Sequence, residues 1–432
     1  MNTTKKQSAA LPIAMMFALF FMISFVTGLQ NPMGVIVKNQ FQVSNLMSQL
    51  GNFANFIAYA VIGIPAGLIL KKRGYKFTAL GACVVGFVGV GVSALSGYIY
   101  DPAINNVGLT FSIYLLGTFI AGLSMCMLNT VVNPMLNTLA GGGNKGNQLI
   151  QLGGTLNSVG ATIVPIFVGA LMGNAATAQL ADARPALWIA MGIFALVFCV
   201  LFFVRIPEPH IEKNAVAKEK DAHSPYSFRH FVLGAIAIFI YVGVEVGIPN
   251  IGNLLMTKDL AMDAATAGTI VGTYWFLMMI GRLIGAAVGA KVSSKAMLST
   301  VSILGILFVL LGIFMPLTTA VKMPVFQSDL SFALVSVPAS IMFFTLCGLC
   351  TSVMWGGIFN LAVEGLGKYT PAASGIFMVM VCGGGVLPLV QGALADATSY
   401  VSSYWVIVAG LAFLLFYALI GSKNVNKDIP VE

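Results

Sequence analysis

Uncharged amides inside long apolar stretches are the residues of this chain with the clearest chemistry. Two sets of polar side chains are each spaced so that they fall on one face of a helix. The sets are Asn52, Asn55 and Tyr59, and Asn129, Asn133 and Asn137. An amide both donates and accepts hydrogen bonds, which suits a ring of hydroxyl groups. A single asparagine serves equally well to hold two helices together, but two stripes on neighbouring helices favour a cavity for a neutral polyhydroxy solute.

Two indole rings extend this interpretation to the second half of the chain. Trp275 and Trp355 lie within apolar stretches, and an indole face suits the apolar C–H side of a sugar. We therefore expect substrate-binding residues in both halves. In the N-terminal half they are Asn31, Asn52, Asn55, Asn129, Asn133 and Asn157. In the C-terminal half they are Asn250, Trp275, Trp355 and Asn360, together with Glu245.

Glu245 is the only acid deep inside an apolar stretch, and Arg282 is the only deep base. A lone carboxylate in a membrane span takes a proton, binds a cation or finds a basic partner, so Glu245 is the candidate coupling residue. At 1.5 Å per residue, Arg282 should lie about 12 Å from the cytoplasmic end of its helix and Glu245 about 20 Å from the same face. We therefore do not assume that they pair, and expect Arg282 to hydrogen-bond carbonyl groups near a cytoplasmic gate.

Metal and enzyme chemistry find little support in the sequence. The six cysteines lie in apolar segments, and the lone pair Cys347-x2-Cys350 lacks a second pair of ligands. The three histidines lie in or beside one polar stretch, outside the apolar segments. One deep acid with no recognisable nucleophile and base argues against an enzyme. We expect no metal site and no cofactor other than a coupling ion, H⁺ or Na⁺.

Composition places these residues in a membrane protein. Apolar residues make up 58% of the 432 residues and charged residues only 8%, which is too few charges for a soluble domain of this length. Most of the apolar stretches reach the roughly 20 residues that a membrane-spanning helix needs. We predict twelve such helices, at about 11–36, 46–70, 77–98, 109–136, 149–172, 186–204, 231–255, 266–290, 296–317, 330–360, 372–394 and 401–421.

The positive charges predict the orientation. With both termini in the cytoplasm, 17 of the 22 Lys and Arg residues fall in cytoplasmic segments, four fall in outer loops, and Arg282 lies inside a helix. The net charge of +8 therefore reflects the orientation of the chain in the membrane. We do not expect nucleic-acid binding, because the sequence has no basic stretch interleaved with aromatic residues. The first apolar stretch is too long for a signal peptide. We expect a monomer in the bacterial inner membrane, with the lipid bilayer and a small solute as its partners.

The chain also repeats itself. Asn137-x7-Lys145 recurs as Asn360-x7-Lys368, and both residues are displaced by 223 positions, about half of the chain. Two related halves are the architecture of a transporter that holds its substrate where the halves meet. A polar, Lys- and Glu-containing linker separates them. We expect a six-helix bundle over 1–204, a cytoplasmic linker over 205–230 and a second six-helix bundle over 231–432.

A loop after the second predicted span carries the first family resemblance. The run from Gly67 to Lys76 reads Gly-Leu-Ile-Leu-Lys-Lys-Arg-Gly-Tyr-Lys. It resembles the loop signature of the major facilitator superfamily, Gly-x3-Asp-Arg-x-Gly-Arg/Lys-Arg/Lys, although Lys71 stands in place of the signature acid. The resemblance implies a cytoplasmic gate. Its candidate residues are Gly67, Lys71, Arg73 and Gly74, and we add Arg282.

Over most of its length the chain resembles the fucose-galactose-glucose permease family of that superfamily. The best-matching pieces are Ile64 to Lys76, Asn133-Pro134, Thr155 to Ser158, Tyr241 to Gly243, Ile280 to Arg282, and Gly365 to Asp396. The resemblance implies an all-helical fold of twelve spans, a central cavity, and uptake of a hexose or deoxyhexose with a coupling cation. The glucose/galactose branch commonly has a glutamate at the place of Glu245. The fucose branch has acids at the positions of Asn31 and Asn129, where this chain has amides that cannot carry a proton.

These observations predict a secondary transporter that imports a neutral hexose-like sugar by alternating access. Coupling stays open between protons at Glu245, sodium at a site that includes Glu245, and simple facilitation. An exporter of a drug or metabolite is the alternative within transporters, and it predicts a more apolar cavity with fewer amides. A sugar sensor without flux is a further alternative, but the linker is short and holds no signalling domain. The sequence does not name the sugar.

Overall fold

The computed structural model describes residues 10–41, 50–100, 106–172, 179–208, 223–262, 264–327, 329–426 and 428–431. Eleven helical segments in this part of the chain are long and apolar enough to cross a membrane. The 30-residue helix α6 (Gly143–Met172), whose last eight side chains are not described, brings the segments of spanning length to the twelve that the hydropathy pattern predicts. The molecule is mostly helical because only backbones that satisfy their own hydrogen bonds are stable in lipid.

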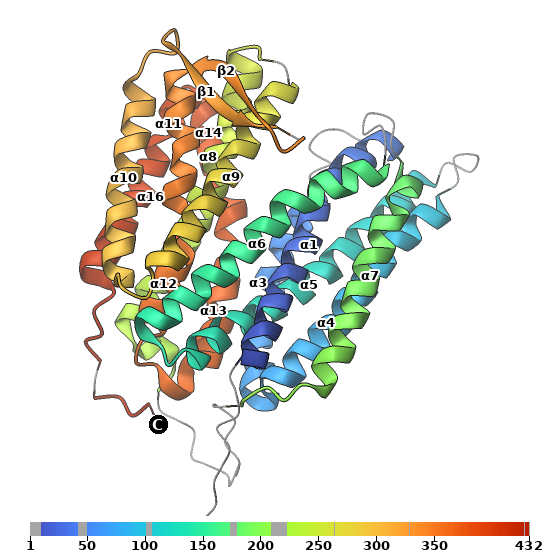
Figure 1. Cartoon of the computed structure of the whole chain (residues 1–432), viewed down its shortest axis with the longest axis vertical. Coiled ribbons are helices and arrows are strands. Elements are labelled where there is room, and N and C mark those ends of the chain that lie inside the picture. The colour runs from blue at the N-terminus through green and yellow to red at the C-terminus, as the bar shows by residue number, and fades with distance from the viewer. Residues whose placement is uncertain are drawn as a thin grey trace, which may run out of the picture.

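The first half of the chain forms one bundle of long helices (Figure 1). Besides α6, these are α1 (Ala10–Phe41), α3 (Leu50–Arg73), α4 (Tyr75–Ile99), α5 (Val107–Leu139) and α7 (Leu180–Phe203). The second half forms another bundle after the short turn η2 (Pro225–Ser227). Its long helices are α8 (Arg229–Leu254, extended by η3, Leu255–Asp259), α9 (Ala264–Val288) and α10 (Ser294–Phe314).

The last three spans are assembled from shorter helices. They are α11 (Ala339–Thr351) with α12 (Met354–Val363), η4 (Gly367–Tyr369) with α13 (Thr370–Met380) and α14 (Gly383–Ala397), and α15 (Tyr400–Ser403) with α16 (Trp405–Phe416) and η5 (Tyr417–Gly421). The break between α11 and α12 leaves the Ser352 carbonyl to accept a hydrogen bond from a side chain, while the Val353 carbonyl accepts from the Gly357 amide and also from a side chain. Broken helices of this kind are a recurrent way to build polar sites inside membrane bundles.

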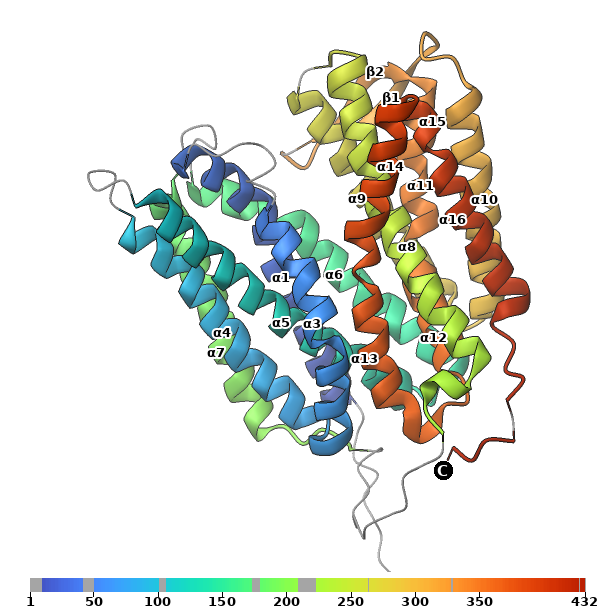
Figure 2. The ribbon, with the colours of Figure 1, turned by 180° about the vertical axis from the view of Figure 1, so that it is seen from behind.

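The two bundles touch at one end and diverge toward the other (Figures 1 and 2). They meet where α3 packs on α13 and where α6 packs on α9. In the first contact, a methyl group added to Gly67 would lie 2.9 Å from the Cα atom of Gly375. In the second, a methyl group added to Gly289 would lie 3.1 Å from the Cα atom of Gln148. The first contact therefore needs glycine, as is typical of small-x3-small pairs at helix crossings in lipid. In the second, a side chain at position 289 fits after a shift of a few tenths of an ångström.

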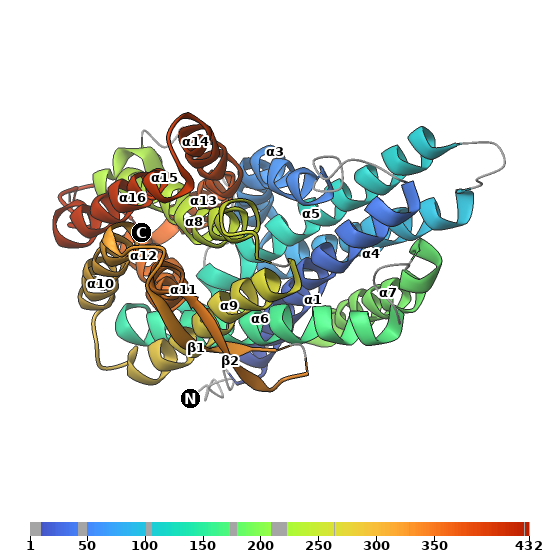
Figure 3. The same cartoon turned by 90° about the horizontal axis from the view of Figure 1, so that it is seen from above.

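A β-hairpin interrupts the helical pattern between α10 and α11. Strand β1 (Ala320–Phe326) pairs antiparallel with β2 (Phe332–Pro338), and the hairpin lies over the outer end of α9 (Figure 3). The predicted span at 330–360 was thus wrong at its start, because residues 332–338 are a strand and the helix begins at Ala339. Hydropathy alone cannot separate a short apolar strand from a helical turn, and this run is rich in Val, Leu and Phe.

The loop after α3 is fixed by an acid from elsewhere in its own half. Gly74 adopts a φ of 89°, a left-handed conformation that glycine tolerates, and α4 starts directly after it. The carboxylate of Glu208 accepts hydrogen bonds from the backbone amides of Tyr75 (2.7 Å) and Lys76 (2.9 Å). Burial raises the pKa of Glu208, and the two amide hydrogen bonds oppose that rise. The helix start that the loop signature marks is therefore capped by Glu208.

Candidate substrate-binding cavity

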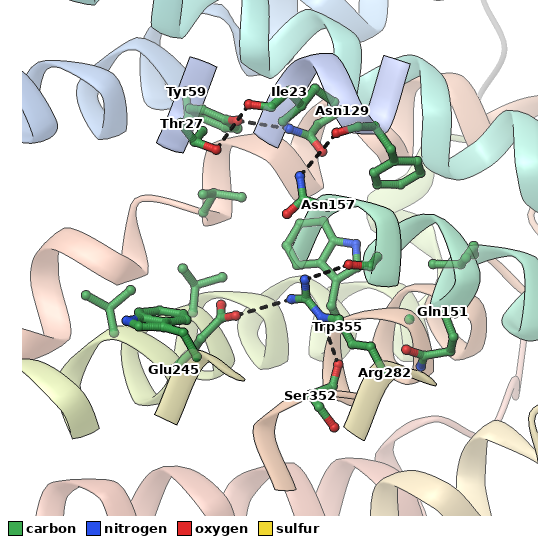
Figure 4. A pocket seen from close by; sticks show the side chains of 18 of the residues that line it. Ile23, Thr27, Tyr59, Asn129, Gln151, Asn157, Glu245, Arg282, Ser352 and Trp355 are labelled. Carbon is green, nitrogen blue, oxygen red and sulfur yellow. Dashed lines mark hydrogen bonds and ion pairs between the residues drawn. The ribbon is translucent and has the colours of Figure 1, made fainter. Parts of the chain in front are cut away.

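A cavity of about 310 Å³ lies between the two bundles, within the size range of small-molecule sites. Polar side chains from both halves line it, together with two indole rings and several apolar groups. The lining residues of the N-terminal half are Phe20, Ile23, Thr27, Asn55, Phe56, Tyr59, Asn129, Ile150, Gln151, Gly154 and Asn157. Those of the C-terminal half are Val242, Glu245, Val246, Trp275, Arg282, Ser352, Trp355, Gly356 and Val381. Figure 4 shows this arrangement.

Three of the predicted asparagines lie in the cavity wall, namely Asn55, Asn129 and Asn157. The Asn129 amide nitrogen donates to the Tyr59 hydroxyl at 2.9 Å and to the carbonyl oxygen of Met125 at 3.0 Å. These asparagines come from α3, α5 and α6, three neighbouring helices of one bundle (Figure 4). Asn55 and Tyr59 of the first predicted stripe and Asn129 of the second thus lie in the cavity wall, and their role in binding stays a prediction.

The opposite wall is aromatic and charged. Trp275 comes from α9 and Trp355 from α12, and both line the cavity as predicted. The indole nitrogen of Trp355 is not available to a ligand, because it donates to Asn133 Oδ1 at 3.3 Å. Trp275 keeps 37% of its surface exposed, more than any other aromatic residue that lines the cavity.

Arg282 and Glu245 form an ion pair in the cavity wall, with 3.4 Å between Nη2 and Oε1. The guanidinium also donates to the Gly154 carbonyl (3.0 Å) and to Ser158 Oγ (2.7 Å) of α6, and to the carbonyl of Ser352 (3.3 Å) in the break between α11 and α12. Only 13% of the Arg282 side chain and 14% of the Glu245 side chain remain exposed. Arg282 therefore ties Glu245 and the C-terminal bundle to α6 of the N-terminal bundle.

This geometry corrects the sequence-based placement of Arg282. Its expected distance from Glu245 rested on positions counted along two separate helices. The long arginine side chain spans the difference in height, and it finds one carbonyl group, that of Ser352, in the break before α12 and another, that of Gly154, on α6. Arg282 does bind carbonyl groups, but it does so in the central cavity and not at a helix end.

Two predicted cavity residues lie elsewhere. Asn250 is exposed, and Asn360 donates to Ser294 Oγ at 2.9 Å beside a separate groove at the pinched end of the bundles. Each stands five residues after a true cavity residue, Glu245 and Trp355 respectively. Five residues of helix turn by about 500°, which is 140° away from the starting face. Asn250 and Asn360 therefore lie in the predicted spans but on helix faces that point away from the cavity.

Asn133 supports the cavity but does not line it. It is fully buried, its nitrogen donates to the Asn129 carbonyl at 3.1 Å, and its oxygen accepts the indole proton of Trp355. Because Trp355 belongs to the other bundle, Asn133 holds the indole across the interface between the halves. The side chains of the two remaining predicted residues, Asn31 and Asn52, lie outside the described part of the structure.

The predicted gate residues other than Arg282 lie at the pinched end, in the loop between α3 and α4 or just before it. Gly67 packs against Gly375 of the other bundle, as a gate residue would. Lys71 and Arg73 are exposed, and the Arg73 guanidinium lies 5.6 Å from the ring centre of Phe77, in its own half. A gating role for these two side chains stays a prediction.

Four polar residues that line the cavity were not among the predicted substrate-binding residues, namely Thr27, Gln151, Arg282 and Ser352. Gln151 is buried, and its nitrogen donates to the Val353 carbonyl of the other bundle at 2.8 Å. The sequence signal for Gln151 was only that it is an amide on the same predicted helix as Asn157, because six residues of helix place the two about 120° apart. No group of three or more metal-ligating side chains occurs among the described residues.

Comparison with known proteins places this cavity in a family. The sequence model of the Major Facilitator Superfamily matches residues 16–387, most of the chain. The chain belongs to the Major Facilitator Superfamily. As a member, it is a multi-pass membrane transporter and not an enzyme.

Relatives within the Major Facilitator Superfamily span nearly the whole chain. A protein of Brucella abortus named glucose/galactose transporter is 30% identical over 98% of this chain and 97% of its own length. The L-fucose-proton symporter of Escherichia coli is 22% identical over 96% of this chain and 93% of its own length. The crystal structure of the transporter FucP in the outward conformation superposes with a TM-score of 0.80, covering 97% of this chain and 100% of that one, at 20% identity. That likeness shows the shared fold.

Proposed function

We propose that this chain imports a neutral hexose or deoxyhexose sugar by alternating access, coupled to a cation through Glu245. The observation that carries the proposal is the cavity between the bundles, which combines amide groups with an exposed indole face. Such a site satisfies hydroxyl groups and covers the apolar side of a pyranose ring. The names of the relatives, glucose/galactose transporter and L-fucose-proton symporter, support the same substrate class.

The charge distribution supports an orientation with both termini in the cytoplasm of a bacterial cell, in the inner membrane. The pinched end of the bundles carries Lys71, Lys72 and Arg73, so it becomes the cytoplasmic side. The diverging end then faces outward, and the structure corresponds to an outward-facing state. We propose a monomer, because one chain holds both halves of the cavity.

The ion pair suggests how a cation is coupled to movement. Arg282 divides its hydrogen bonds between Glu245 and two groups of α6. A proton or a sodium ion on Glu245 cancels the charge that holds the guanidinium, so the strength of the contact between the bundles changes with ion binding. Coupling then needs no acid at Asn31 or Asn129, where the fucose branch has one. The choice between H⁺ and Na⁺ is left to experiment.

Glu245→Gln tests the proposal, because it keeps the shape of the side chain and removes its charge. The protein is reconstituted in proteoliposomes with D-glucose, D-galactose and L-fucose as probes. If Glu245 carries a proton, the variant loses uphill accumulation and retains exchange of labelled sugar. If Glu245 binds sodium, wild-type accumulation needs sodium at constant pH and the variant loses that need. Glu364→Gln, an exposed acid outside the cavity, is the matched control.

Other results of the same experiment count against parts of the proposal. Weaker sugar affinity with an unchanged ion dependence would make Glu245 a residue that orients the sugar. Accumulation and ion dependence that both survive would remove the coupling role altogether. Exchange without accumulation in the wild type would make the protein a facilitator. If none of the three sugars shows counterflow, the proposed substrate class is wrong. The alternative of a drug or metabolite exporter would then have to be tested, although the amide-lined cavity disfavours it.

A further inference from the structure

Amide side chains in the cavity wall share one orientation, in which the nitrogen atom is bound inside the protein. The nitrogen of Asn129 is used by Tyr59 and by the Met125 carbonyl. The nitrogen of Gln151 is used by the Val353 carbonyl at 2.8 Å and lies 3.4 Å from Asn147 Oδ1. In all these contacts the amide donates inside the protein. The oxygen atom is then the part of the side chain that is left for a ligand.

Asn157 repeats the pattern in a third position. Its nitrogen donates to the Phe20 carbonyl at 3.4 Å, and Figure 4 shows its oxygen turned away from that carbonyl, into the cavity. The Gln151 oxygen likewise points toward the centre of the site in that view. Asn129, Gln151 and Asn157 are called the acceptor amides below.

The orientation of these amides follows from their partners. Oxygen and nitrogen of an amide are assigned from the hydrogen-bond network. Each of the three nitrogens lies against a backbone carbonyl oxygen, which can only accept. A flipped amide would place oxygen against oxygen and bury an unpaired carbonyl, at a cost of about 1–3 kcal/mol for each group. The chain thus sets its own amides with their oxygens toward the ligand.

Two further groups add oxygen acceptors to the same wall. The single hydroxyl proton of Thr27 is directed to the carbonyls of Ile23 (3.1 Å) and Ser24 (3.2 Å). The Thr27 hydroxyl can therefore only accept a hydrogen bond from a ligand, through the lone pairs of its oxygen. The Glu245 carboxylate has two oxygens, of which Oε1 lies by Arg282. Acceptors therefore come from α1, α5, α6 and α8, on both sides of the cavity.

Donors are fewer among the described lining residues. Four of the five N–H groups of Arg282 are directed to Ser352, Gly154, Ser158 and Glu245. The Trp355 indole proton is taken by Asn133. The Asn55 amide and the Trp275 indole have no hydrogen bond to any described residue. Together with the hydroxyl proton of Tyr59, which accepts from Asn129, and the fifth N–H of Arg282, they are the groups left to donate to a ligand.

We propose that the cavity selects its substrate by hydrogen-bond donors, so that sugar hydroxyls donate to the acceptor amides. This rests on the proposed function and narrows it. A hydroxyl is recognised through its proton, which no ether, fluoro or keto group can replace. The cavity thus favours free, unsubstituted polyols and rejects analogues that keep size and polarity but lose the proton, because the acceptor oxygens are then left unpaired.

Matched sugar analogues test the proposal directly on the purified wild-type protein. D-glucose, D-galactose and L-fucose are first screened for binding by quenching of tryptophan fluorescence. For the sugar that binds, each hydroxyl is replaced in turn by hydrogen and by fluorine. Fluorine keeps a weak acceptor and removes the donor. At the positions that meet the acceptor amides, we expect the deoxy and the deoxyfluoro sugars to lose affinity equally, by about ten-fold or more.

The variant Asn157→Ala localises the effect. Removing this oxygen should abolish the ten-fold loss at one ring position and leave the losses at the others, as in a double-mutant cycle. Asn144→Ala is the matched control, because it is an exposed asparagine on the same helix, outside the cavity. If Asn157→Ala does not fold, the analogue series on the wild type still decides the question.

Each outcome bears on one of the two proposals. Deoxyfluoro sugars that bind like the parent, while deoxy sugars lose affinity, would show that the protein donates and would overturn the inference alone. If all analogues bind like the parent sugar, no hydroxyl group contributes to recognition, and the inference is also overturned. If none of the three parent sugars binds, the proposed sugar specificity fails, and the donor rule fails with it.

Discussion

At the scale of single residues, the chemistry of this cavity depends on which atoms the protein has already used. Asn129 and Asn133 stand one turn apart and look equivalent in the sequence. Asn129 keeps its oxygen for the cavity, whereas both ends of the Asn133 amide are bound inside the protein. Sequence spacing selects the face of a helix, but it does not show which neighbour will take a hydrogen bond.

Asn129→Ala is predicted to weaken sugar binding by about 1–3 kcal/mol, the scale of leaving a buried polar partner unpaired. The Kd for the sugar, measured by fluorescence or thermal shift on the folded variant, checks this. Asn250→Ala is the control, because Asn250 is a predicted site residue that the structure places outside the cavity. Equal affinity in the Asn129 variant and the wild type would reduce Asn129 to a structural role.

Arg282→Gln is predicted to destabilise the protein more than the double variant Arg282→Gln/Glu245→Gln. The single change leaves the Glu245 carboxylate without its cation in a poorly hydrated site, which costs up to about 3–5 kcal/mol. The double change removes both charges together. Melting temperatures of the wild type, the two single variants and the double variant form the cycle. Additive losses would mean that the two charges do not stabilise each other.

At the scale of secondary-structure elements, hydropathy predicted the spans well and their internal breaks poorly. Twelve apolar stretches became twelve helical segments of spanning length, because lipid exposure demands about 20 apolar residues in each. The break at Ser352 and Val353 carries no proline or glycine and was not expected. That break leaves the Ser352 carbonyl to Arg282, so the missed feature of the backbone and the misplaced arginine belong together.

Gly67→Val tests the contact between α3 and α13. Its side chain would meet the backbone of Gly375, which cannot move aside as a flexible side chain does. We expect the pinched end to open and the population to shift toward the state in which that end is accessible. Labelling of a cysteine introduced at that end measures the shift. Gly192→Val is the control, since a methyl group there meets nothing within 4 Å. Unchanged labelling would argue that this crossing does not hold the closed end.

At the scale of the whole molecule, the internal repeat explains why the pinched end has two similar contacts. Gly63 and Gly67 of α3 correspond to Gly285 and Gly289 of α9, since 285 − 63 = 289 − 67 = 222, one less than the offset of the other repeats. Gly63 and Gly67 face α13 of the opposite bundle, and Gly289 faces Gln148 of α6, whereas Gly285 lies closest to Val353 of its own bundle. The sequence repeat therefore predicted two related halves, while the packing of one half on the other depends on side-chain shapes that it does not specify.

A disulfide across the second contact should arrest transport without removing the cavity. A Cβ atom built on Gly289 lies 3.4 Å from Gln148 Cβ, near the 3.5–4.5 Å that a disulfide spans. Oxidised Gln148→Cys/Gly289→Cys should bind sugar with wild-type affinity from the diverging end, because the cavity stays open there. Flux in proteoliposomes should fall to background and return on reduction, because alternating access requires the pinched end to separate.

The single variants Gln148→Cys and Gly289→Cys, treated with the same oxidant, control for the substitutions and for the six native cysteines. Cross-linking is verified on a gel from the altered mobility of the oxidised double variant. Full transport by a completely cross-linked protein would show that α6 and α9 stay together throughout the cycle. Alternating access would then have to proceed by movements within each bundle, and the ion pair of Arg282 and Glu245 could no longer act by releasing α6.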